Sequence, residues 1–223
     1  MMLETKLGFQ VLDVCPLCGC EPMPLAHGLK TFVSHFDAII AAQYAYCATC
    51  DFSFSTNPFD DDTMAQYYRF NDQLRRDDLT AAEAHHIHEQ LDFVQQAVPV
   101  EKSARILEIG ADFGAFLELA VRRFQAEAYF SEFNIAARER LLLKGFLDLS
   151  QQPEDLTFDV IVLRHVFEHV VYPVRYLQAL RERLLPHGVV FIEVPDYSCL
   201  DLANCDEFQL EHVVSESQNA ARP

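Results

Sequence analysis

The residues that decide the fold are 105–117, which read RILEIGADFGAFL. The first five predict a short buried strand that ends at Gly110, because three of them are aliphatic and glycine interrupts the run. Phe116 and Leu117, followed by apolar residues at 120, 121 and 124, have the spacing of one helix face. Glycines in the turn between strand and helix let the backbone approach a ligand, and a helix N-terminus favours negative charge. We therefore expect a ligand site at this turn.

Alternating strands and helices continue downstream of this turn. The predicted strands cover residues 128–130, 146–147, 158–163 and 189–194, and the predicted helices cover 135–144 and 173–185. Residues 186–188 are expected to form a turn before the last strand. This alternation predicts an α/β fold with a parallel sheet and right-handed crossovers.

The acids and glycines near the turn narrow the class of ligand. Glu132 is the next acid at the end of a predicted strand, and an acid at that point binds ribose hydroxyls in nucleotide-type folds. The dinucleotide fingerprint G-x-G-x-x-G is not met, because Asp112 and Ala115 stand at its second and third glycine positions. NAD is therefore disfavoured.

Two C-x-x-C pairs, Cys15 with Cys18 and Cys47 with Cys50, lie near the N-terminus. Each pair brings two thiolates within reach of one ion, and two pairs complete a tetrahedral S₄ shell. We predict one structural zinc in a zinc-ribbon-like module, because four cysteines leave no open coordination position for catalysis.

Changes in composition divide the chain into four expected parts. They are a zinc-ribbon-like module over residues 1–58, a helical linker over 59–102, an α/β domain over 103–214 and a flexible tail over 215–223. Within the linker, His85, His86 and His88 are expected to form a solvated helical face.

The net charge excludes several classes of partner. The 223-residue chain carries 34 acids against 17 bases, which gives a net charge of −17. Because nucleic-acid affinity depends on lysines and arginines, bulk nucleic acid is disfavoured, and an anionic membrane is disfavoured for the same reason. The sequence has neither a run of about 18 apolar residues nor a secretory signal, so we expect a cytoplasmic protein.

Three motifs in order resemble class I S-adenosylmethionine-dependent methyltransferases. Residues 106–117 are similar to their first motif, 158–170 to the motif around their fourth strand, and 184–195 to the motif around their fifth strand. The cysteine pairs, Asn57-Pro58, Tyr67-Tyr68 and Glu211-His212 resemble the sugar C-methyltransferase-like group, which has a zinc-binding head. The resemblance implies a Rossmann-like methyltransferase sheet with a small zinc-ribbon module in front of it.

The resemblance also implies roles for individual residues. Cofactor-binding positions would be Glu108, Gly110, Asp112, Gly114, Glu132 and Arg164. Catalytic positions would be His212 as general base, Glu211 to orient it, His165 beside the methyl-transfer pocket and Tyr68 at the acceptor site. Glu168 and His169 either orient a loop against the sheet or take part in catalysis.

The resemblance leaves three functions open. The main hypothesis is methyl transfer from S-adenosylmethionine to a small-molecule acceptor, with a nucleotide-linked sugar as one candidate. Because five of the seven strands of the complete fold are recognisable, the chain is expected to be short at its C-terminus and to lack the sixth and seventh. A second hypothesis is therefore a truncated, non-catalytic binding protein whose exposed sheet edge is completed by a partner or a second copy. The third is a metal-assisted 2′-O-methyltransferase that uses Glu168, His169 and His212.

Overall fold

The computed structural model describes residues 7–33, 39–69, 79–98, 102–195 and 214–216. The chain forms two compact units. The first unit comprises residues 1–68, 167–176 and 194–223, and the second comprises 69–166 and 177–193. Each unit has its own sheet and its own hydrophobic core.

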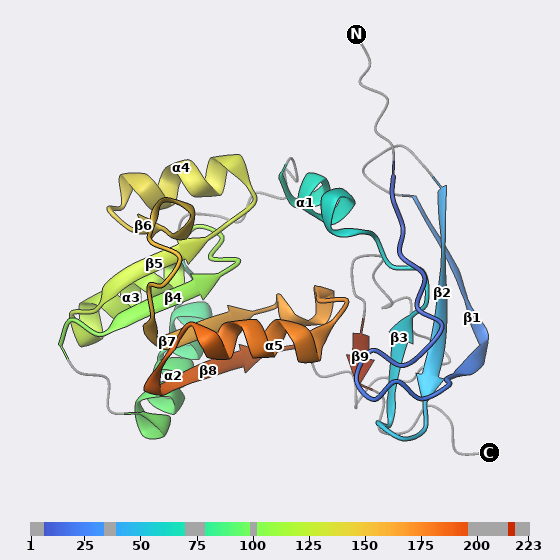
Figure 1. Cartoon of the computed structure of the whole chain (residues 1–223). Helices are drawn as coiled ribbons and strands as arrows, with labels where there is room; N and C mark the ends of the chain where they lie inside the picture. The colour runs from blue at the N-terminus through green and yellow to red at the C-terminus, as the bar shows by residue number, and fades with distance from the viewer. Residues whose placement is uncertain (1–6, 34–38, 70–78, 99–101, 196–213, 217–223) are drawn as a thin grey trace, which may run out of the picture. The chain divides into compact units, whose positions relative to one another are not determined.

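The second unit is built on a five-stranded sheet in the order β6-β5-β4-β7-β8 (Figure 1). Its strands are β4 (Arg105–Ile109), β5 (Glu127–Ser131), β6 (Leu147–Asp148), β7 (Phe158–Arg164) and β8 (Leu184–Glu193). All neighbouring strands pair in parallel, which confirms the predicted α/β fold with a parallel sheet. The chain moves outward from β4 to β6 and then returns to β7, so the strand order reverses between β4 and β7. Ligands of open α/β sheets bind at the carboxyl ends of the strands beside such a reversal.

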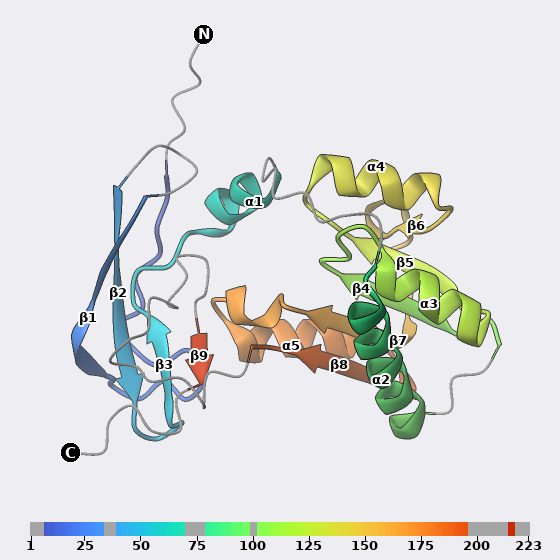
Figure 2. The ribbon, with the colours of Figure 1, turned by 180° about the vertical axis from the view of Figure 1, so that it is seen from behind.

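Helices cover both faces of this sheet (Figure 2). They are α2 (Ala81–Ala97), α3 (Ala115–Phe124), α4 (Ile135–Leu143) and the part of α5 (Pro173–Glu182) from residue 177 on, with the short 3₁₀ helix η1 (Leu149–Gln151). A second 3₁₀ helix, η2 (Phe167–His169), belongs to the first unit. Helix α2 begins with a capping box, in which the Thr80 hydroxyl accepts from the N–H of Glu83 and the Glu83 carboxylate accepts from the N–H of Thr80. Figures 1 and 2 show α2 and α3 on one face of the sheet, and α5 over the opposite face of β7 and β8.

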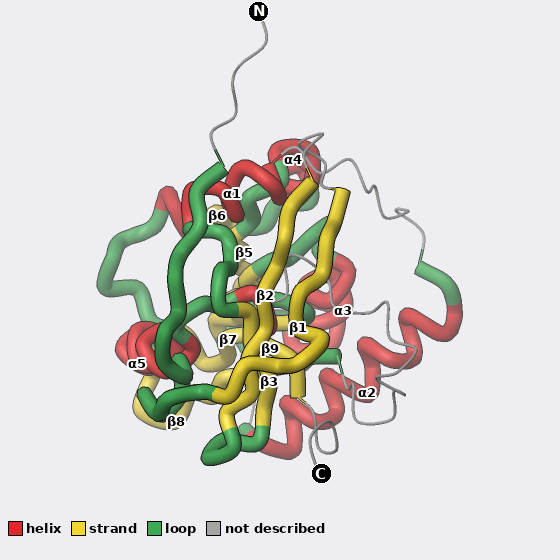
Figure 3. The backbone as a smooth tube through the Cα atoms, turned by 90° about the vertical axis from the view of Figure 1, so that its right-hand side faces the viewer, coloured by secondary structure: helices red, strands yellow, loops and turns green. Residues whose placement is uncertain are grey.

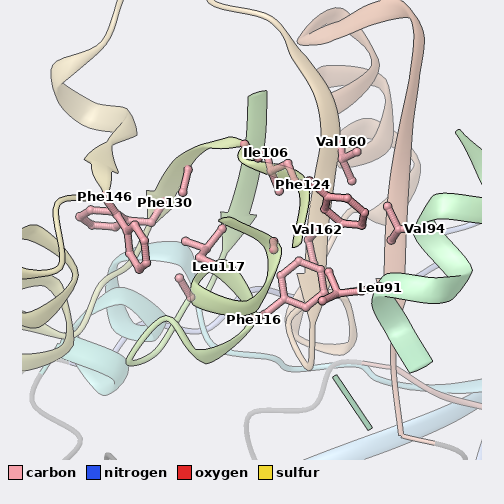
Figure 4. Packing of buried hydrophobic residues seen from close by; sticks show 14 of the residues in the cluster. Leu91, Val94, Ile106, Phe116, Leu117, Phe124, Phe130, Phe146, Val160 and Val162 are labelled. Carbon is pink, nitrogen blue, oxygen red and sulfur yellow. The ribbon is translucent and has the colours of Figure 1, made fainter. Parts of the chain in front are cut away.

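The core under α2, α3 and α4 holds the unit together (Figure 4). Alternate residues of β4, β5 and β7 point into it, including Ile106, Phe130 and Val162. Helix α2 contributes Ile87, Leu91 and Val94 to it. Helix α2, the second half of the segment 59–102 that the sequence suggested as a helical linker, therefore supplies one wall of this core.

The start of β8 differs from the sequence-based expectation. The preceding helix ends at Glu182, before the predicted residue 185, and residues 186–188 lie inside β8 instead of forming a separate turn. The β7–β8 register shifts between Phe158 and Val160, which pair with Leu184 and Val189. Pro186 has no N–H to donate to a strand ladder, and a bulge of this kind accommodates it.

The first unit holds a four-stranded antiparallel sheet in the order β1-β2-β3-β9 (Figure 3). Its strands are β1 (Met23–Val33), β2 (Ile39–Cys47), β3 (Phe52–Ser55) and β9 (Val214–Glu216), and its helix is α1 (Asp61–Arg69). Its core contains Leu12, Cys15, Cys47, Phe52, Phe54 and neighbouring residues. Because β9 includes residues 215 and 216, the first two residues of the expected tail belong to a strand.

In the described residues, the strand that follows β8 is β9, and it pairs with β3. The parallel sheet therefore shows five strands over the described part of the chain, as expected, and residues 196–213 lie outside that part. No described helix has the length and apolar character needed to cross a membrane.

Candidate cofactor and metal sites

The loop between β4 and α3 is wound in the left-handed region at three positions. The φ angles are +68° at Gly110, +48° at Asp112 and +79° at Gly114. A Cβ at Gly110 would lie 2.5 Å from Cγ2 of Val166, and one at Gly114 would lie 2.6 Å from a methyl group of Leu141. Both glycines are thus required by the packing of the loop against its own unit. Asp112 adopts the conformation as a non-glycine residue, which aspartate tolerates better than most residues do.

Glu132 holds this loop in place. Its Oε2 accepts a hydrogen bond from the N–H of Asp112 at 2.9 Å, and its Oε1 accepts one from the N–H of Asn134 at 2.8 Å. Burial raises the pKa of Glu132, while these two N–H groups lower it. A carboxylate has about four lone-pair sites, so acceptor capacity remains for the ribose hydroxyls that the sequence assigned to it. The role in shaping the loop was not foreseen, because it depends on the adjacency of β4 and β5.

Glu108 lies in the interior at the carboxyl end of β4. It is 1% exposed, and its Oε1 accepts a hydrogen bond from Nη1 of Arg164 at 3.3 Å. Its Oε2 has no hydrogen-bond partner among the described residues. Burial raises the pKa of Glu108 to about 8, against the lowering effect of Arg164 and with a further rise from Asp112 and Glu132.

Arg164 is shared between two carboxylates at the ends of neighbouring strands. Besides contacting Glu108, it lies with its Nε 3.5 Å from Oε2 of Glu193, at the end of β8. Its guanidinium also lies 5.5 Å from the centre of the Phe116 ring. We predicted Arg164 as a cofactor-binding residue, and the structure shows it held by side chains of its own unit.

Glu193 extends this polar network to α2. Its Oε1 accepts from Nε2 of His86 at 2.7 Å, and its Oε2 accepts from the amide of Gln90. The sequence suggested that His86 belongs to a solvated face, and the side chain is indeed 56% exposed, although it also makes this contact. Glu193 was missed because nothing local marks it as different from other strand-end acids.

Phe113 fastens the glycine loop to α4. Its carbonyl accepts from Nζ of Lys144 at 2.5 Å, and the same amine forms an ion pair with Glu118. The guanidinium of Arg140 lies 4.5 Å from the centre of the Phe113 ring. These contacts, together with those of Glu132, hold the loop from two sides.

Tyr68 and His169 meet in the first unit. The Tyr68 hydroxyl lies 3.1 Å from Nε2 of His169, and the two rings pack edge to face. His169 also lies 3.9 Å from the buried carboxylate of Glu168. The sequence placed Tyr68 at the acceptor site and left the role of His169 open.

The other three predicted catalytic residues are less closely defined by the structure. His165 follows β7, is exposed and has a φ of +54°, and its N–H donates to the carbonyl of Glu193. Glu211 and His212 lie outside the described residues, so their roles stay predictions.

The four predicted zinc ligands converge on one point. The Sγ atoms of Cys15, Cys18, Cys47 and Cys50 all lie within 4.8 Å of one another. Two of the separations are 4.0 Å for Cys15–Cys50 and 3.6 Å for Cys18–Cys47. A zinc ion with bonds of about 2.3 Å to four sulfurs at tetrahedral corners needs sulfurs about 3.8 Å apart. The donor set therefore fits a tetrahedral zinc site.

The environment acts in opposite directions on two thiols of the cluster, because burial raises the pKa of Cys50 while hydrogen bonds lower that of Cys47. Burial disfavours charge on Cys47, but backbone N–H groups of Cys50 and Thr49 and the thiols of Cys15 and Cys18 donate to its sulfur. The net result is a pKa of about 7 for Cys47. Metal binding requires deprotonated sulfurs, and a bound cation would favour the thiolate form of all four ligands.

Comparison with known proteins places the chain in a family. Residues 82–220 match the family described as "Methyltransferase domain", and the chain belongs to that family. The α/β fold and the prediction of a methyltransferase are thereby confirmed at the level of fold and family. The match begins inside α2, in agreement with the place of this helix in the core of the second unit. No curated protein matches the sequence.

Solved structures with a similar fold include three methyl-transfer or related enzymes. The cyclopropane synthase MmaA2 from Mycobacterium tuberculosis is 18% identical, with a TM-score of 0.43, over 60% of this chain and 52% of that one. A SAM-dependent methyltransferase from Geobacter sulfurreducens, in complex with S-adenosyl-L-homocysteine, is 17% identical, with a TM-score of 0.38, over 47% of each chain. A phosphoethanolamine N-methyltransferase 2 from Haemonchus contortus is 18% identical, with a TM-score of 0.43, over 52% and 30%. The chain thus spans about half or less of these solved proteins.

Proposed function

We propose that the chain binds S-adenosylmethionine in its second unit and transfers the methyl group to a small-molecule acceptor, with a nucleotide-linked sugar as the candidate class. Membership in the methyltransferase family supports this function. The observation that carries it is the hydrogen bond between the glycine loop after β4 and Glu132 after β5. This bond lies at the carboxyl edge of the sheet, beside the strand-order reversal where such folds bind nucleotide-like ligands.

The residues of this edge suit the cofactor. The glycine loop opens α3, whose N-terminus favours the cofactor carboxylate, and Glu132 offers its remaining lone pairs to the ribose hydroxyls. Glu108 presents a buried carboxyl oxygen without a hydrogen-bond partner among the described residues, and a polar ligand would satisfy it. When bound, S-adenosylmethionine supplies a methyl group on a sulfonium that a nucleophile displaces in line. The protein contributes mainly by positioning the two reactants.

An acceptor that loses a proton requires a base. His212, oriented by Glu211, is the base that the family resemblance assigns.

The cysteine cluster is proposed to bind one structural zinc ion. Cys15, Cys18, Cys47 and Cys50 would hold it, and four thiolates leave no position for a reacting group. The ion would join the turn around Cys15 and Cys18 to the turn that links β2 to β3, which compensates for the small core of the first unit.

Isothermal titration calorimetry on the zinc-loaded full chain tests the proposed function. We expect binding of both S-adenosylmethionine and S-adenosylhomocysteine. The Glu132→Ala variant should bind at least about tenfold more weakly, because it loses both a ribose acceptor and a support of the glycine loop. Glu139→Ala, an exposed acid on α4, is the matched control and should bind like the wild type. A folded wild-type protein that binds neither ligand would refute the proposal.

A further inference from the structure

The charges around Glu108 do not balance. From β7, Arg164 faces Glu108, but it also faces Glu193 of β8. From the glycine loop and from the end of β5, the acids Asp112 and Glu132 face Glu108 and oppose its ionisation. One guanidinium therefore lies among four carboxyl groups at the carboxyl edge of the sheet.

Because one oxygen of Glu108 has no hydrogen-bond partner among the described residues, the imbalance of charge affects the protonation of this group. The residue is 1% exposed, and its Oε2 has no hydrogen-bond partner within the described residues. Burial of an ionised carboxylate without full pairing is strongly unfavourable, so the group binds a proton instead. The same physical reason raises the pKa of Glu108 to about 8. In the free protein near pH 7, Glu108 is then mostly protonated.

A ligand with positive charge changes this balance. At neutral pH S-adenosylmethionine carries a sulfonium, an ammonium and a carboxylate and has a net charge of +1, whereas its thioether product lacks the sulfonium and is neutral. Both ligands carry the ammonium and the carboxylate, so the sulfonium is the charge that distinguishes them, and a positive charge near the buried carboxyl group favours its ionised form.

We propose that Glu108 makes the site prefer the sulfonium cofactor over its thioether product, and that Glu108 releases its proton to the solvent when the sulfonium form binds. This inference rests on the function proposed above and assigns Glu108 the role of a specificity-determining residue. Methyl transfer removes the charge that the site recognises, so the thioether product binds more weakly than S-adenosylmethionine and is replaced by it. Product then leaves as Glu108 takes up a proton again.

The expected size is stated as a change in the pKa of Glu108. A nearby opposite charge lowers the pKa of a carboxyl group by about one to three units, and the lower end corresponds to about a tenfold change in an equilibrium. The pKa of Glu108 would fall by about one unit when the sulfonium form binds. Linkage then requires the release of about half a proton near pH 7.5.

Calorimetry at several pH values tests the proposal. S-adenosylmethionine and S-adenosylhomocysteine are titrated into wild type and Glu108→Gln between pH 6 and pH 9, in buffers of different ionisation enthalpy that report released protons. In the wild type, the preference for S-adenosylmethionine should grow about tenfold more over this range than in the variant. At pH 7.5 the wild type should release about half a proton more than the variant on binding S-adenosylmethionine. The amino groups of the ligands also titrate, and the titrations of Glu108→Gln and of the control variant measure their contribution.

Glu127→Gln is the matched control, because Glu127 is exposed at the amino end of β5 and undergoes the same change of charge. It should behave like the wild type. If Glu108→Gln does not fold, ¹³C NMR of glutamate-labelled wild-type protein replaces it. The carboxyl resonance that titrates near pH 8 should then move about one unit lower with saturating S-adenosylmethionine, and not with S-adenosylhomocysteine.

The outcomes separate the two proposals. Equal preference and equal proton release in wild type and Glu108→Gln would overturn the role of Glu108 and leave the proposed function intact. An unshifted carboxyl resonance would have the same meaning. Failure of the folded wild type to bind either ligand would overturn both.

Discussion

Replacement of Glu108 by Gln should remove a pH-dependent loss of stability. The pKa of Glu108 is about 8 in the folded protein and 4.5 in the unfolded reference. Between these two values the folded state binds more protons than the unfolded state, so the free energy of unfolding decreases as pH rises. The change begins near the unfolded pKa and is complete above the folded pKa.

The magnitude follows from the shift. The difference of about 3.5 pKa units corresponds to about 5 kcal/mol, at about 1.4 kcal/mol per unit. Gln resembles the protonated acid at every pH. The stability advantage of Glu108→Gln over wild type should therefore grow by about 4 kcal/mol between pH 5 and pH 9.

Urea unfolding followed by far-ultraviolet circular dichroism measures this difference. Most of the helical signal comes from α2, α3 and α4, which lie in the second unit. Glu127→Gln, with its exposed acid, should give a curve parallel to that of the wild type. Parallel pH profiles of wild type and Glu108→Gln would show that the buried carboxyl group is paired in solution, and the reasoning would then fail.

Three further predictions concern the metal, the core and the loop. Metal analysis of the purified chain should find one zinc per chain, and the double variant Cys15→Ser/Cys18→Ser should lose it. A metal-free wild type would contradict the proposed zinc site. Phe130→Ala should destabilise the second unit by about 3–5 kcal/mol in urea, whereas the exposed Phe133→Ala should change its stability by less than about 0.5 kcal/mol. Gly114→Ala should destabilise the unit by at least about 1 kcal/mol, because φ is +79° and the new methyl group would meet α4; a variant of wild-type stability would refute the close approach.

Local patterns predicted the elements of the parallel sheet well. The strands around 106, 129 and 161 and the helix from Pro173 were recognised because hydrophobic periodicity and punctuation by Gly and Pro act over a few residues. The bulge in β8 was missed, since a Pro-x-Gly sequence indicates a turn until a neighbouring strand is known to accept it. Helix α2 was predicted as a helix, but the surface that buries its apolar face was not predictable from the helix alone.

The candidate sites also combine features that local sequence patterns predicted with contacts that only the folded chain creates. The four cysteines were identified from spacing alone, because ligation by C-x-x-C pairs is a local property, and the structure brings their sulfurs together. Glu132 was identified from its position after a strand, yet its hydrogen bond to the loop joins two separate strand ends. Asp112 was recognised as a departure from a glycine pattern, and the left-handed backbone at this residue became evident only in the folded loop.

The sequence by itself determined the α/β alternation, the glycine turn, the family and the four cysteines that could hold one metal ion, since each depends on residues that are close in the chain or on a recognisable motif. Only the tertiary structure decided which charged and polar groups meet. Arg164 lies between Glu108 and Glu193 because β4, β7 and β8 are neighbours in the sheet, and Tyr68 meets His169 across 101 residues of sequence. Such contacts depend on strand order and packing, which no local periodicity specifies, and they decide where a proton or a charge is held.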